Sequence, residues 1–359
     1  MEVDRRHFVV GSSLALSGLA QAGAGNAARP ATPTTRRRIA TEEAFTTPAQ
    51  TKAMLALADS SWPSLDLGLW RSRTIDSPMI SHLSLEGDRL RLMDQSGIAM
   101  QVLSLTSPGV QMFDADLGVA IAEDANDRLA EHIRKYKGRY AGLATFTPQA
   151  PKQAVKEMER AISRLGLNGF ICNSHTNGEY LDDAKYWPIL EAAEALDRPI
   201  YIHPRSPSDA MTSAYGKYGL EFAVWGFQAE VGLHAMRLIL GGVFDRFPRL
   251  KIIIGHMGEN VPFHLGRSDT RHNREHAPIK RKPSEYFLDN FYITTSGVTD
   301  HLPLKYCIEK LGADKILWAV DYPYEFNQIA VDAMDAAPIS EADREAIYFR
   351  NAERVFRIT

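Results

Sequence analysis

The chain alternates short runs of apolar, mostly β-branched residues with longer segments whose apolar residues recur every three or four positions. The first pattern is typical of buried strands and the second of amphipathic helices. The apolar runs predict eight strands, at residues 37–45, 100–106, 140–147, 168–173, 199–204, 250–256, 291–296 and 316–321. Eight strands that alternate with helices favour a closed parallel (β/α)8 barrel, the TIM-barrel fold of the α/β class.

The helical pattern is clearest over residues 114–137, where Leu117, Ile121, Ala125, Leu129 and Ile133 share one stripe. Acidic residues begin this segment and basic residues end it, as the helix dipole favours. Further helices are predicted over residues 87–97, 151–165, 182–196 and 229–244. Two connections are longer than a barrel needs, one after the first strand (residues 46–85) and one after the fifth (205–227). Such long connections usually carry function or subunit contacts.

Composition narrows the choice of partners. The 359 residues carry a net charge of −3, and basic residues are scattered apart from Arg36, Arg37 and Arg38. A nucleic-acid partner is therefore not expected. The two cysteines, Cys172 and Cys307, lie far apart in the sequence and in no CxxC pattern, so we expect two free thiols.

The first residues are predicted to be a targeting segment. Arg5 and Arg6 begin a twin-arginine pattern, and a segment rich in glycine, alanine and serine follows. We expect a signal peptide over residues 1–28, a linker over 29–36 and one barrel domain over 37–359. The signal is too short to be a stable membrane anchor, and it predicts export of the folded protein to the periplasm. The alternative is a disordered tail.

Residues capable of metal binding or proton transfer stand where predicted strands end. The first strand ends near Glu42 and Glu43, the fifth at His203, the sixth at His256 and the eighth at Asp321. The carboxyl ends of all barrel strands meet at one rim, where active sites of this fold lie. Because neighbouring strand residues point to opposite faces, at most one of the two glutamates faces the interior, and the other packs or pairs at the rim.

Each of these residues has an ordinary interpretation when taken alone. A strand-end acid is usually exposed, His203 could be a hydrogen-bonded core histidine, and Asp321 could cap a helix. Their convergence on one rim favours a metal site instead. Glu42, His203 and Asp321 would hold one divalent metal ion with open positions for substrate, and their nitrogen and oxygen ligands suit Mn²⁺, Zn²⁺ or Mg²⁺.

Seven motifs, in this order, are similar to those of one known family: IATEEAF, LTSPGVQ, NSHTNGEYLD, YIHP, GHMGE, TTSGV and DYPY. From Arg37 to the C-terminus, the chain resembles the metal-dependent decarboxylases of the amidohydrolase superfamily, which act on acids such as γ-resorcylate, 2,3-dihydroxybenzoate and 5-carboxyvanillate. Many superfamily members have a histidine where this chain has Ala44, so one imidazole ligand is absent.

The resemblance implies a role for each matching residue. Glu42, His203 and Asp321 would bind the metal, and Asp321 would also donate a proton. His256 and Glu259 would position and activate a substrate hydroxyl group. Arg267 and Tyr324 would hold a second substrate carboxylate. The resemblance also implies an arginine at this carboxylate that a neighbouring subunit contributes. The only candidates for it in this chain are Arg71 and Arg73.

The expected activity is non-oxidative decarboxylation of a small ortho-hydroxy aromatic acid by a carboxy-lyase that needs no organic cofactor. From this resemblance we also expect a homo-oligomer, either a dimer or a tetramer. One alternative is a metal-dependent hydrolase of a lactone, amide or ester, which could use the same residues. Another is a periplasmic barrel that binds aromatic acids without catalysis. The missing second histidine and the Arg267 and Tyr324 pair favour decarboxylation.

Overall fold

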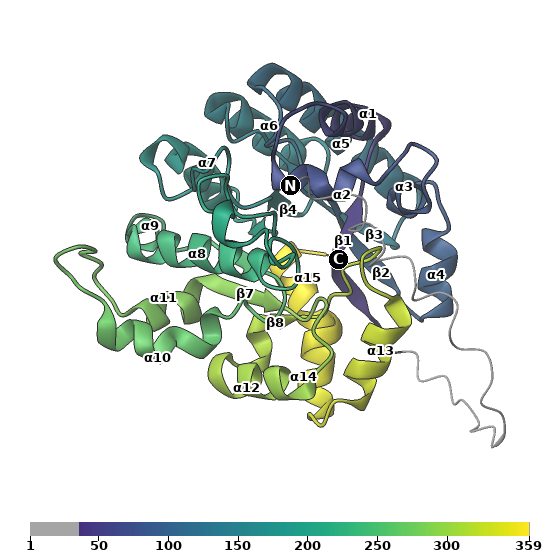
Figure 1. Ribbon diagram of the computed structural model, residues 1–359. Coiled ribbons are helices and arrows are strands. Elements are labelled where there is room, and N and C mark those ends of the chain that lie inside the picture. The colour runs from purple at the N-terminus through teal and green to yellow at the C-terminus, as the bar shows by residue number, and fades with distance from the viewer. Residues whose placement is uncertain (1–35, 359) are drawn as a thin grey trace. The chain divides into compact units, whose positions relative to one another are not determined.

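The computed structural model describes residues 36–358 and confirms the predicted barrel. All eight strands are parallel and neighbour one another in sequence order. Helices surround them on the outside (Figure 1). The strands are β1 (Ile39–Phe45), β2 (Met100–Leu105), β3 (Tyr140–Thr145), β4 (Gly169–Cys172), β5 (Ile200–Ile202), β6 (Ile252–Ile254), β7 (Phe291–Thr294) and β8 (Ile316–Leu317).

The ring closes between its first strand and its last. The N–H of Thr41 in β1 donates to the carbonyl of Trp318 (3.1 Å), and the N–H of Ala44 donates to the carbonyl of Tyr322 (2.8 Å). Both acceptors lie just beyond β8. The carboxyl ends of β1 and β8 are therefore neighbours, although they are far apart in the sequence.

The helices between and after the strands are α1 (Pro48–Ala58), α2 (Gly68–Arg71), α3 (Pro78–Leu83), α4 (Arg89–Gln95), α5 (Ala115–Lys135), α6 (Pro151–Ser163), α7 (Trp187–Ala195), α8 (Gly226–Leu240), α9 (Val243–Arg246), α10 (Val261–Arg271), α11 (Pro283–Asn290), α12 (His301–Leu311), α13 (Asn327–Ala336), α14 (Glu341–Glu345) and α15 (Asn351–Phe356). The long helix α5 begins as predicted, because the Asp114 side chain accepts a hydrogen bond from the Leu117 N–H (2.9 Å).

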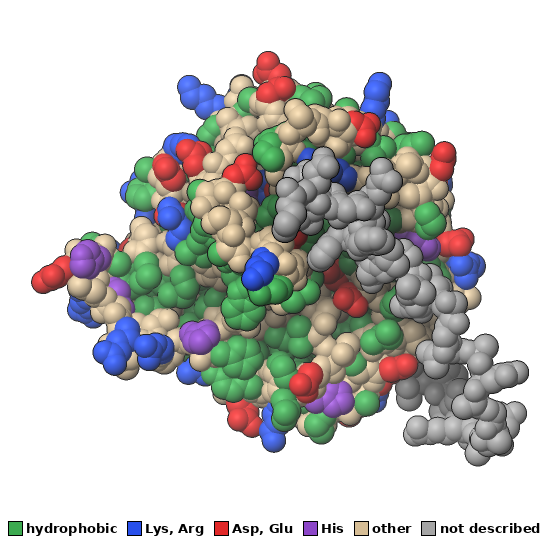
Figure 2. Space-filling view, viewed as in Figure 1, with side chains coloured by type: hydrophobic (Ala, Val, Ile, Leu, Met, Phe, Trp, Pro, Cys, Tyr) green, Lys and Arg blue, Asp and Glu red, His purple; other side chains and the backbone are tan. Residues whose placement is uncertain are grey.

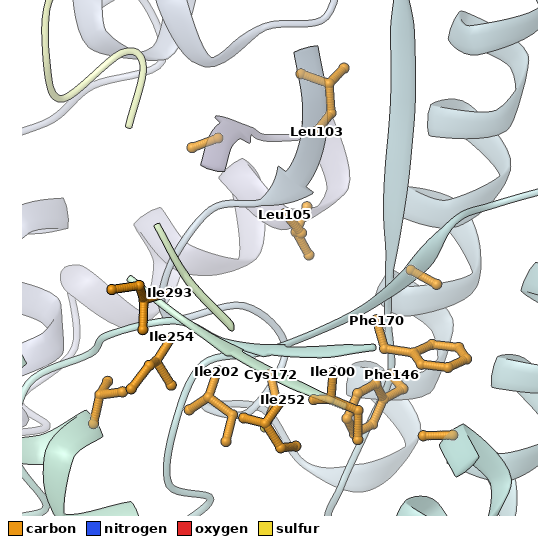
Figure 3. Close-up of a cluster of buried hydrophobic side chains, with 14 of the residues drawn as sticks. Leu103, Leu105, Phe146, Phe170, Cys172, Ile200, Ile202, Ile252, Ile254 and Ile293 are labelled. Carbon is orange, nitrogen blue, oxygen red and sulfur yellow. The ribbon is translucent and has the colours of Figure 1, made fainter. Parts of the chain in front are cut away.

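The apolar core has two layers, which explains why the strands read as continuous apolar runs. Figure 3 shows the outer layer, where alternate strand residues such as Phe170, Ile202 and Ile254 pack with side chains of the surrounding helices. The residues between them, such as Ile171 and Ile253, form an inner cluster with the C-terminal helix α15. A strand that is buried on both faces shows little polar alternation.

Three predicted elements differ from the structure at their ends. The helix predicted over 229–244 is two helices, α8 and α9, because Gly242 adopts a left-handed conformation (φ +74°) between them. The helix predicted from residue 182 begins only at Trp187, with Pro188 in its first turn. The last strand ends at Leu317 and not at Asp321, because the N–H groups of Val320 and Tyr322 bind the Glu43 side chain.

The first long connection contains three helices, α1, α2 and α3, that the sequence pattern did not indicate. Helix α1 lacks an apolar stripe, because its buried positions include Gln50 and Thr51. The side-chain amide of Gln50 donates to the Thr106 carbonyl (3.0 Å), which ties α1 to the end of β2. Because part of the buried face of α1 is polar, hydrophobic periodicity does not detect this helix.

A buried ion pair joins the two long connections above the barrel rim. The guanidinium of Arg205, the second residue after His203, contacts the Asp66 carboxylate of the first connection. Asp66 also accepts a hydrogen bond from the Ser206 N–H (3.0 Å). Both side chains are almost fully buried. The chain just after His203 is therefore held by the first connection.

Other expectations concern the cysteines and the N-terminus. Cys172 and Cys307 are both buried free thiols, as predicted. Arg36, expected to be the last linker residue, forms an ion pair with Asp335 (3.1 Å). The predicted twin-arginine signal falls on residues outside the described ones. Between residues 36 and 358, none of the helices has the length and apolar character to cross a bilayer.

Candidate metal centre

Glu42, His203 and Asp321 meet at the carboxyl end of the barrel, as the sequence predicted. Glu42 lies in β1, and His203 and Asp321 follow β5 and β8. The Nε2 atom of His203 lies 3.5 Å from Glu42 Oε1 and 4.0 Å from Asp321 Oδ1. One ligand atom from each residue lies within 4.8 Å of the others. In Figure 2, red acidic side chains are visible in the hollow at the centre of this face.

Two oxygen atoms at this point have no partner within residues 36–358. Glu42 Oε1 and Asp321 Oδ1 are buried and accept no hydrogen bond. Leaving charged oxygens unpaired in a buried place is costly, and such atoms usually bind a cation. Both are the atoms that face His203 Nε2. The site therefore fits one divalent metal ion held by these three residues.

The imidazole ring of His203 is oriented by its own loop. His203 Nδ1 lies 2.9 Å from the Pro204 carbonyl, which can only accept, so Nδ1 carries the proton. The Nε2 lone pair is then free to bind a metal. Metal-binding histidines usually have such a partner on the other ring nitrogen, because it fixes the tautomer and the ring orientation.

Two hydroxyl groups from the end of β7 hold the other oxygen of Glu42. Thr294 Oγ1 donates to Glu42 Oε2 (2.8 Å), and the Ser296 hydroxyl also donates to it. Ser296 Oγ accepts the N–H of His256 (3.1 Å) as well. This arrangement turns Oε1 toward the metal position. The sequence motif TTSGV contained both residues, but nothing in it indicated this role.

Gly255 leaves room for the acidic cluster. A Cβ atom at this position would lie 2.9 Å from Glu42 Oε1 and 3.3 Å from Glu259 Oε1. Any larger residue would displace the metal ligand. The residue directly after β6 therefore has to be glycine, for a reason that only the packing shows.

His256 and Glu259 form the predicted pair beside the metal position. His256 Nδ1 lies 2.7 Å from Glu259 Oε1, and its Nε2 lies 3.6 Å from Asp321 Oδ2. The loop that carries both residues has positive φ values from His256 (+46°) to Asn260 (+66°). Backbone in this region is strained for residues other than glycine, and such strain gathers at functional sites. The pair can orient or exchange a proton above the metal position.

The charges of the cluster set the protonation of its members. Burial lowers the pKa of His256, but the Glu259 and Glu42 carboxylates outweigh this effect and hold it well above its usual value. Burial raises the pKa of Asp321, but the neighbouring imidazoles of His203 and His256 hold it below its usual value. The site attracts positive charge. Asp321 therefore needs a proton source to act as an acid, and His256 is beside it.

Glu43 faces away from the metal position, as expected for one of the two neighbouring glutamates. It is fully buried, and both of its oxygens accept backbone N–H groups of the segment after β8. Burial raises the pKa of Glu43 to about 8, whereas the Val320 N–H and the Arg89 charge lower it. The donors on both oxygens oppose the effect of burial, because they stabilise the charged form.

Tyr324 is tied to Asp321, because its backbone N–H donates to the Asp321 carbonyl (2.8 Å), and it has two polar neighbours. Its phenol bonds with Thr106 Oγ1 (2.6 Å). The Arg73 guanidinium lies 5.8 Å from the Tyr324 ring and 5.0 Å from the Trp70 ring. The Arg73 Nη1 atom is buried without a hydrogen-bond partner in the described part of the chain. An anionic group beside Tyr324 would satisfy this atom.

The other two arginines differ in their contacts. Arg71 donates to the carbonyls of Trp62 and Ala58 and so stabilises its own connection. Arg267 is exposed on α10, and its side chain forms no ion pair within residues 36–358. Asp269, a possible partner for it, instead accepts from Ser284 (2.9 Å). The structure thus brings Arg73, and not Arg71, to Tyr324.

Comparisons with known proteins point to one family. A family model with the description "Amidohydrolase" matches residues 81–358. The γ-resorcylate decarboxylase of Polaromonas sp. is 38% identical over 334 residues, which are 89% of this chain and 98% of that protein.

Two solved structures share nearly the whole fold. The 5-carboxyvanillate decarboxylase of Sphingomonas paucimobilis is 46% identical, with a TM-score of 0.87, over 90% of this chain and 100% of that chain. The 5-carboxyvanillate decarboxylase of Novosphingobium aromaticivorans is 36% identical, with a TM-score of 0.85, over 90% of this chain and 96% of that chain. That structure is a complex with manganese and 4-hydroxy-3-methoxy-5-nitrobenzoic acid.

Replacing one ligand should remove the metal. We predict that His203→Ala loses its bound ion, from about one per chain to near zero, because a three-ligand site has no spare donor. Metal content after gel filtration measures this directly. The matched control is His301→Ala, which removes a half-buried imidazole on the outer helix α12. Full metal occupancy in His203→Ala would show that the three residues are not the ligands.

Proposed function

The chain belongs to the amidohydrolase family and is a metal-dependent carboxy-lyase, and we propose that it decarboxylates an ortho-hydroxy aromatic acid resembling 5-carboxyvanillate. One observation carries this proposal. The two carboxylate oxygens without partners and His203 Nε2 converge beside the His256 and Glu259 pair, in a fold shared with named decarboxylases. The manganese in one of those relatives makes Mn²⁺ the metal that we propose for this chain.

The metal and three side chains have different roles in the proposed reaction. When bound, the divalent ion supplies positive charge that polarises the oxygens of an acid. His256, supported by Glu259, orients the ortho hydroxyl group and accepts its proton. Asp321 delivers a proton to the ring carbon that bears the carboxylate. A C–H bond forms there, the C–C bond breaks, and its electron pair returns to the ring as CO₂ leaves.

We propose that His256 also supplies the proton that Asp321 donates to the ring. Because Asp321 has a lowered pKa, its proton has to come from a neighbouring acid. His256 has a raised pKa and its Nε2 lies 3.6 Å from Asp321 Oδ2. The proton taken from the hydroxyl group can pass along this pair to the ring, and a proton from solvent then restores the phenol.

A metal-dependent hydrolase of a lactone, amide or ester is the alternative function. It would use the same ligands and the same histidine to act on water. The relatives that cover most of this chain are named as decarboxylases, which favours CO₂ release. Identification of the products separates the two, because only decarboxylation shortens the acid by one carbon.

A second acidic group on the substrate would explain why Arg73, beside Tyr324, has a buried nitrogen without a partner in the described part of the chain. Arg267 and Tyr324 are the residues that we propose to bind it, with Arg73 as a further donor beside Tyr324. A planar guanidinium matches the two oxygens of a carboxylate, and a phenol adds one neutral donor. The substrate is then a diacid, as the word carboxyvanillate in the relatives' names implies.

We also propose that the chain forms a homo-oligomer, either a dimer or a tetramer. Large apolar side chains are exposed on one side of the barrel: Leu302 on α12 (74%), Phe326 just before α13 (71%) and Phe263 on α10 (46%). In Figure 2, green side chains gather over the region of α10 and α12. Exposed apolar clusters of this kind favour association.

Charge selection gives the sharpest substrate test. We predict that Arg267→Ala lowers kcat/KM for 5-carboxyvanillate about ten- to a hundredfold, because a charge-assisted contact contributes roughly 1.5–3 kcal/mol. The monoacid salicylate should lose far less. Arg271→Ala, on the same helix and also exposed, is the matched control. Equal losses on both acids, or none on either, would contradict recognition of the second carboxylate by Arg267.

Export can be tested separately. We propose that residues 1–28 direct the folded protein to the periplasm through the twin-arginine pair. Arg5→Lys combined with Arg6→Lys should leave the protein in the cytoplasm, still folded and active, since neither residue belongs to the barrel domain. Fractionation and immunoblotting measure the location. Continued export of the double variant would mean that these arginines are not a signal.

A further inference from the structure

We propose that Glu43 is a positioning residue for Asp321, because its carboxylate clamps the backbone on both sides of that metal ligand. The proposal rests on the metal site described above and on no particular substrate. The strand pattern alone does not tell which of Glu42 and Glu43 faces the barrel interior, but the structure does. Glu42 faces the metal position, whereas Glu43 points between β1 and the segment after β8.

Glu43 binds two N–H groups that flank Asp321. Its Oε1 accepts the N–H of Val320 (3.0 Å), and its Oε2 accepts the N–H of Tyr322 (3.1 Å). The side-chain amide of Gln101 in β2 donates to the same Oε2 (3.3 Å). All of this is buried, with the exposure of Glu43 at 0%. One side chain thus fixes residues 320 and 322 together, and Asp321 is held between them.

Asp321 needs such support because its backbone is strained. Its φ is +78°, in the left-handed region, which is unfavourable for a residue other than glycine. No sheet ladder supports it, since β8 ends at Leu317. The strand β1 is irregular opposite this point, where its register with β2 shifts between Ala40 and Glu43. Such bulges re-aim side chains beside active sites.

Tyr322 is restrained from its other sides as well. Its carbonyl accepts the N–H of Ala44 (2.8 Å), and its phenol bonds with His82 Nδ1 (3.1 Å). The Arg89 guanidinium lies 4.8 Å from its ring. Arg89 is itself buried, and it donates to the Ala44 carbonyl (2.6 Å) and to Gln101 Oε1 (3.2 Å). One buried network therefore joins α4, β1 and β2 to the residue after Asp321.

The chemistry requires a carboxylate and not merely a polar group. Both oxygens of Glu43 face N–H donors, and the side chain offers an acceptor oxygen to each of them. A glutamine of the same shape would direct its NH₂ group at one backbone N–H and leave that N–H without an acceptor. The released segment would let Asp321 Oδ1 move away from Glu42 Oε1 and His203 Nε2. Asp321 would then bind the metal less firmly.

The competing explanation is that Glu43 only closes the barrel. A purely structural carboxylate would affect the free energy of unfolding but leave the metal affinity of the folded protein unchanged. A positioning residue changes both. Manganese affinity, measured in the absence of substrate, therefore separates the two roles.

The experiment uses Glu43→Gln in the full chain. After removal of metal, Mn²⁺ is titrated into the folded protein, and free Mn²⁺ is followed by electron paramagnetic resonance. We expect the dissociation constant to rise about 10- to 100-fold, the usual effect of losing a partner behind a metal ligand. The matched control is Glu157→Gln on the outer helix α6, where a buried carboxylate binds Asn126 and Arg160. It should lose stability but keep the affinity for Mn²⁺.

A second variant covers the case in which Glu43→Gln does not fold. Gln101→Met removes the side-chain amide that donates to Glu43 and leaves the carboxylate in place, so a smaller rise, of roughly a few-fold, is expected. Wild-type Mn²⁺ affinity in each variant that folds would overturn the proposal. Because no substrate is present, weakened Mn²⁺ binding supports the role of Glu43 even if the wild-type protein releases no CO₂ and the proposed function fails.

Discussion

Two carboxylates with free oxygens in one buried place impose the main constraint on this molecule. Glu42 and Asp321 bring oxygen atoms without hydrogen-bond partners to within 4.8 Å of each other and of His203. Two like charges about 4 Å apart repel by roughly 4 kcal/mol at the effective dielectric of a protein surface. The barrel holds them together, and a divalent cation at their centre removes the repulsion. The folded protein is therefore built to bind metal.

The surrounding residues make that arrangement possible and direct its chemistry. Hydroxyl groups at the end of β7 turn one oxygen of Glu42 away from the centre, and the Gly255 position leaves space beside the other. The acidic neighbours of His256 raise its pKa, so it can take up a proton and hold it next to Asp321. Each feature serves a site that collects positive charge and passes one proton, which is what decarboxylation of an aromatic acid requires.

The sequence predicted the parts that depend on local pattern. The β-branched runs located the eight strands, and residues at their carboxyl ends identified Glu42, His203, His256 and Asp321, because parallel strands must end at one rim. It did not predict helix α1, whose buried face is polar, or the break at Gly242. Nor did it assign roles to Ser296 or Glu43. Their partners lie 254 and 277 residues away in the sequence, so only the folded chain shows these contacts.

The most direct test of the central claim is reconstitution of the metal-free protein. Mn²⁺ is added in steps to protein stripped of metal, and CO₂ release from 5-carboxyvanillate is measured at each step. Without metal, no CO₂ should form, and activity should rise in proportion to added ion until it levels off at about one ion per chain. Release of CO₂ at the full rate from metal-free protein, or a product with all of its carbon atoms retained, would contradict the account.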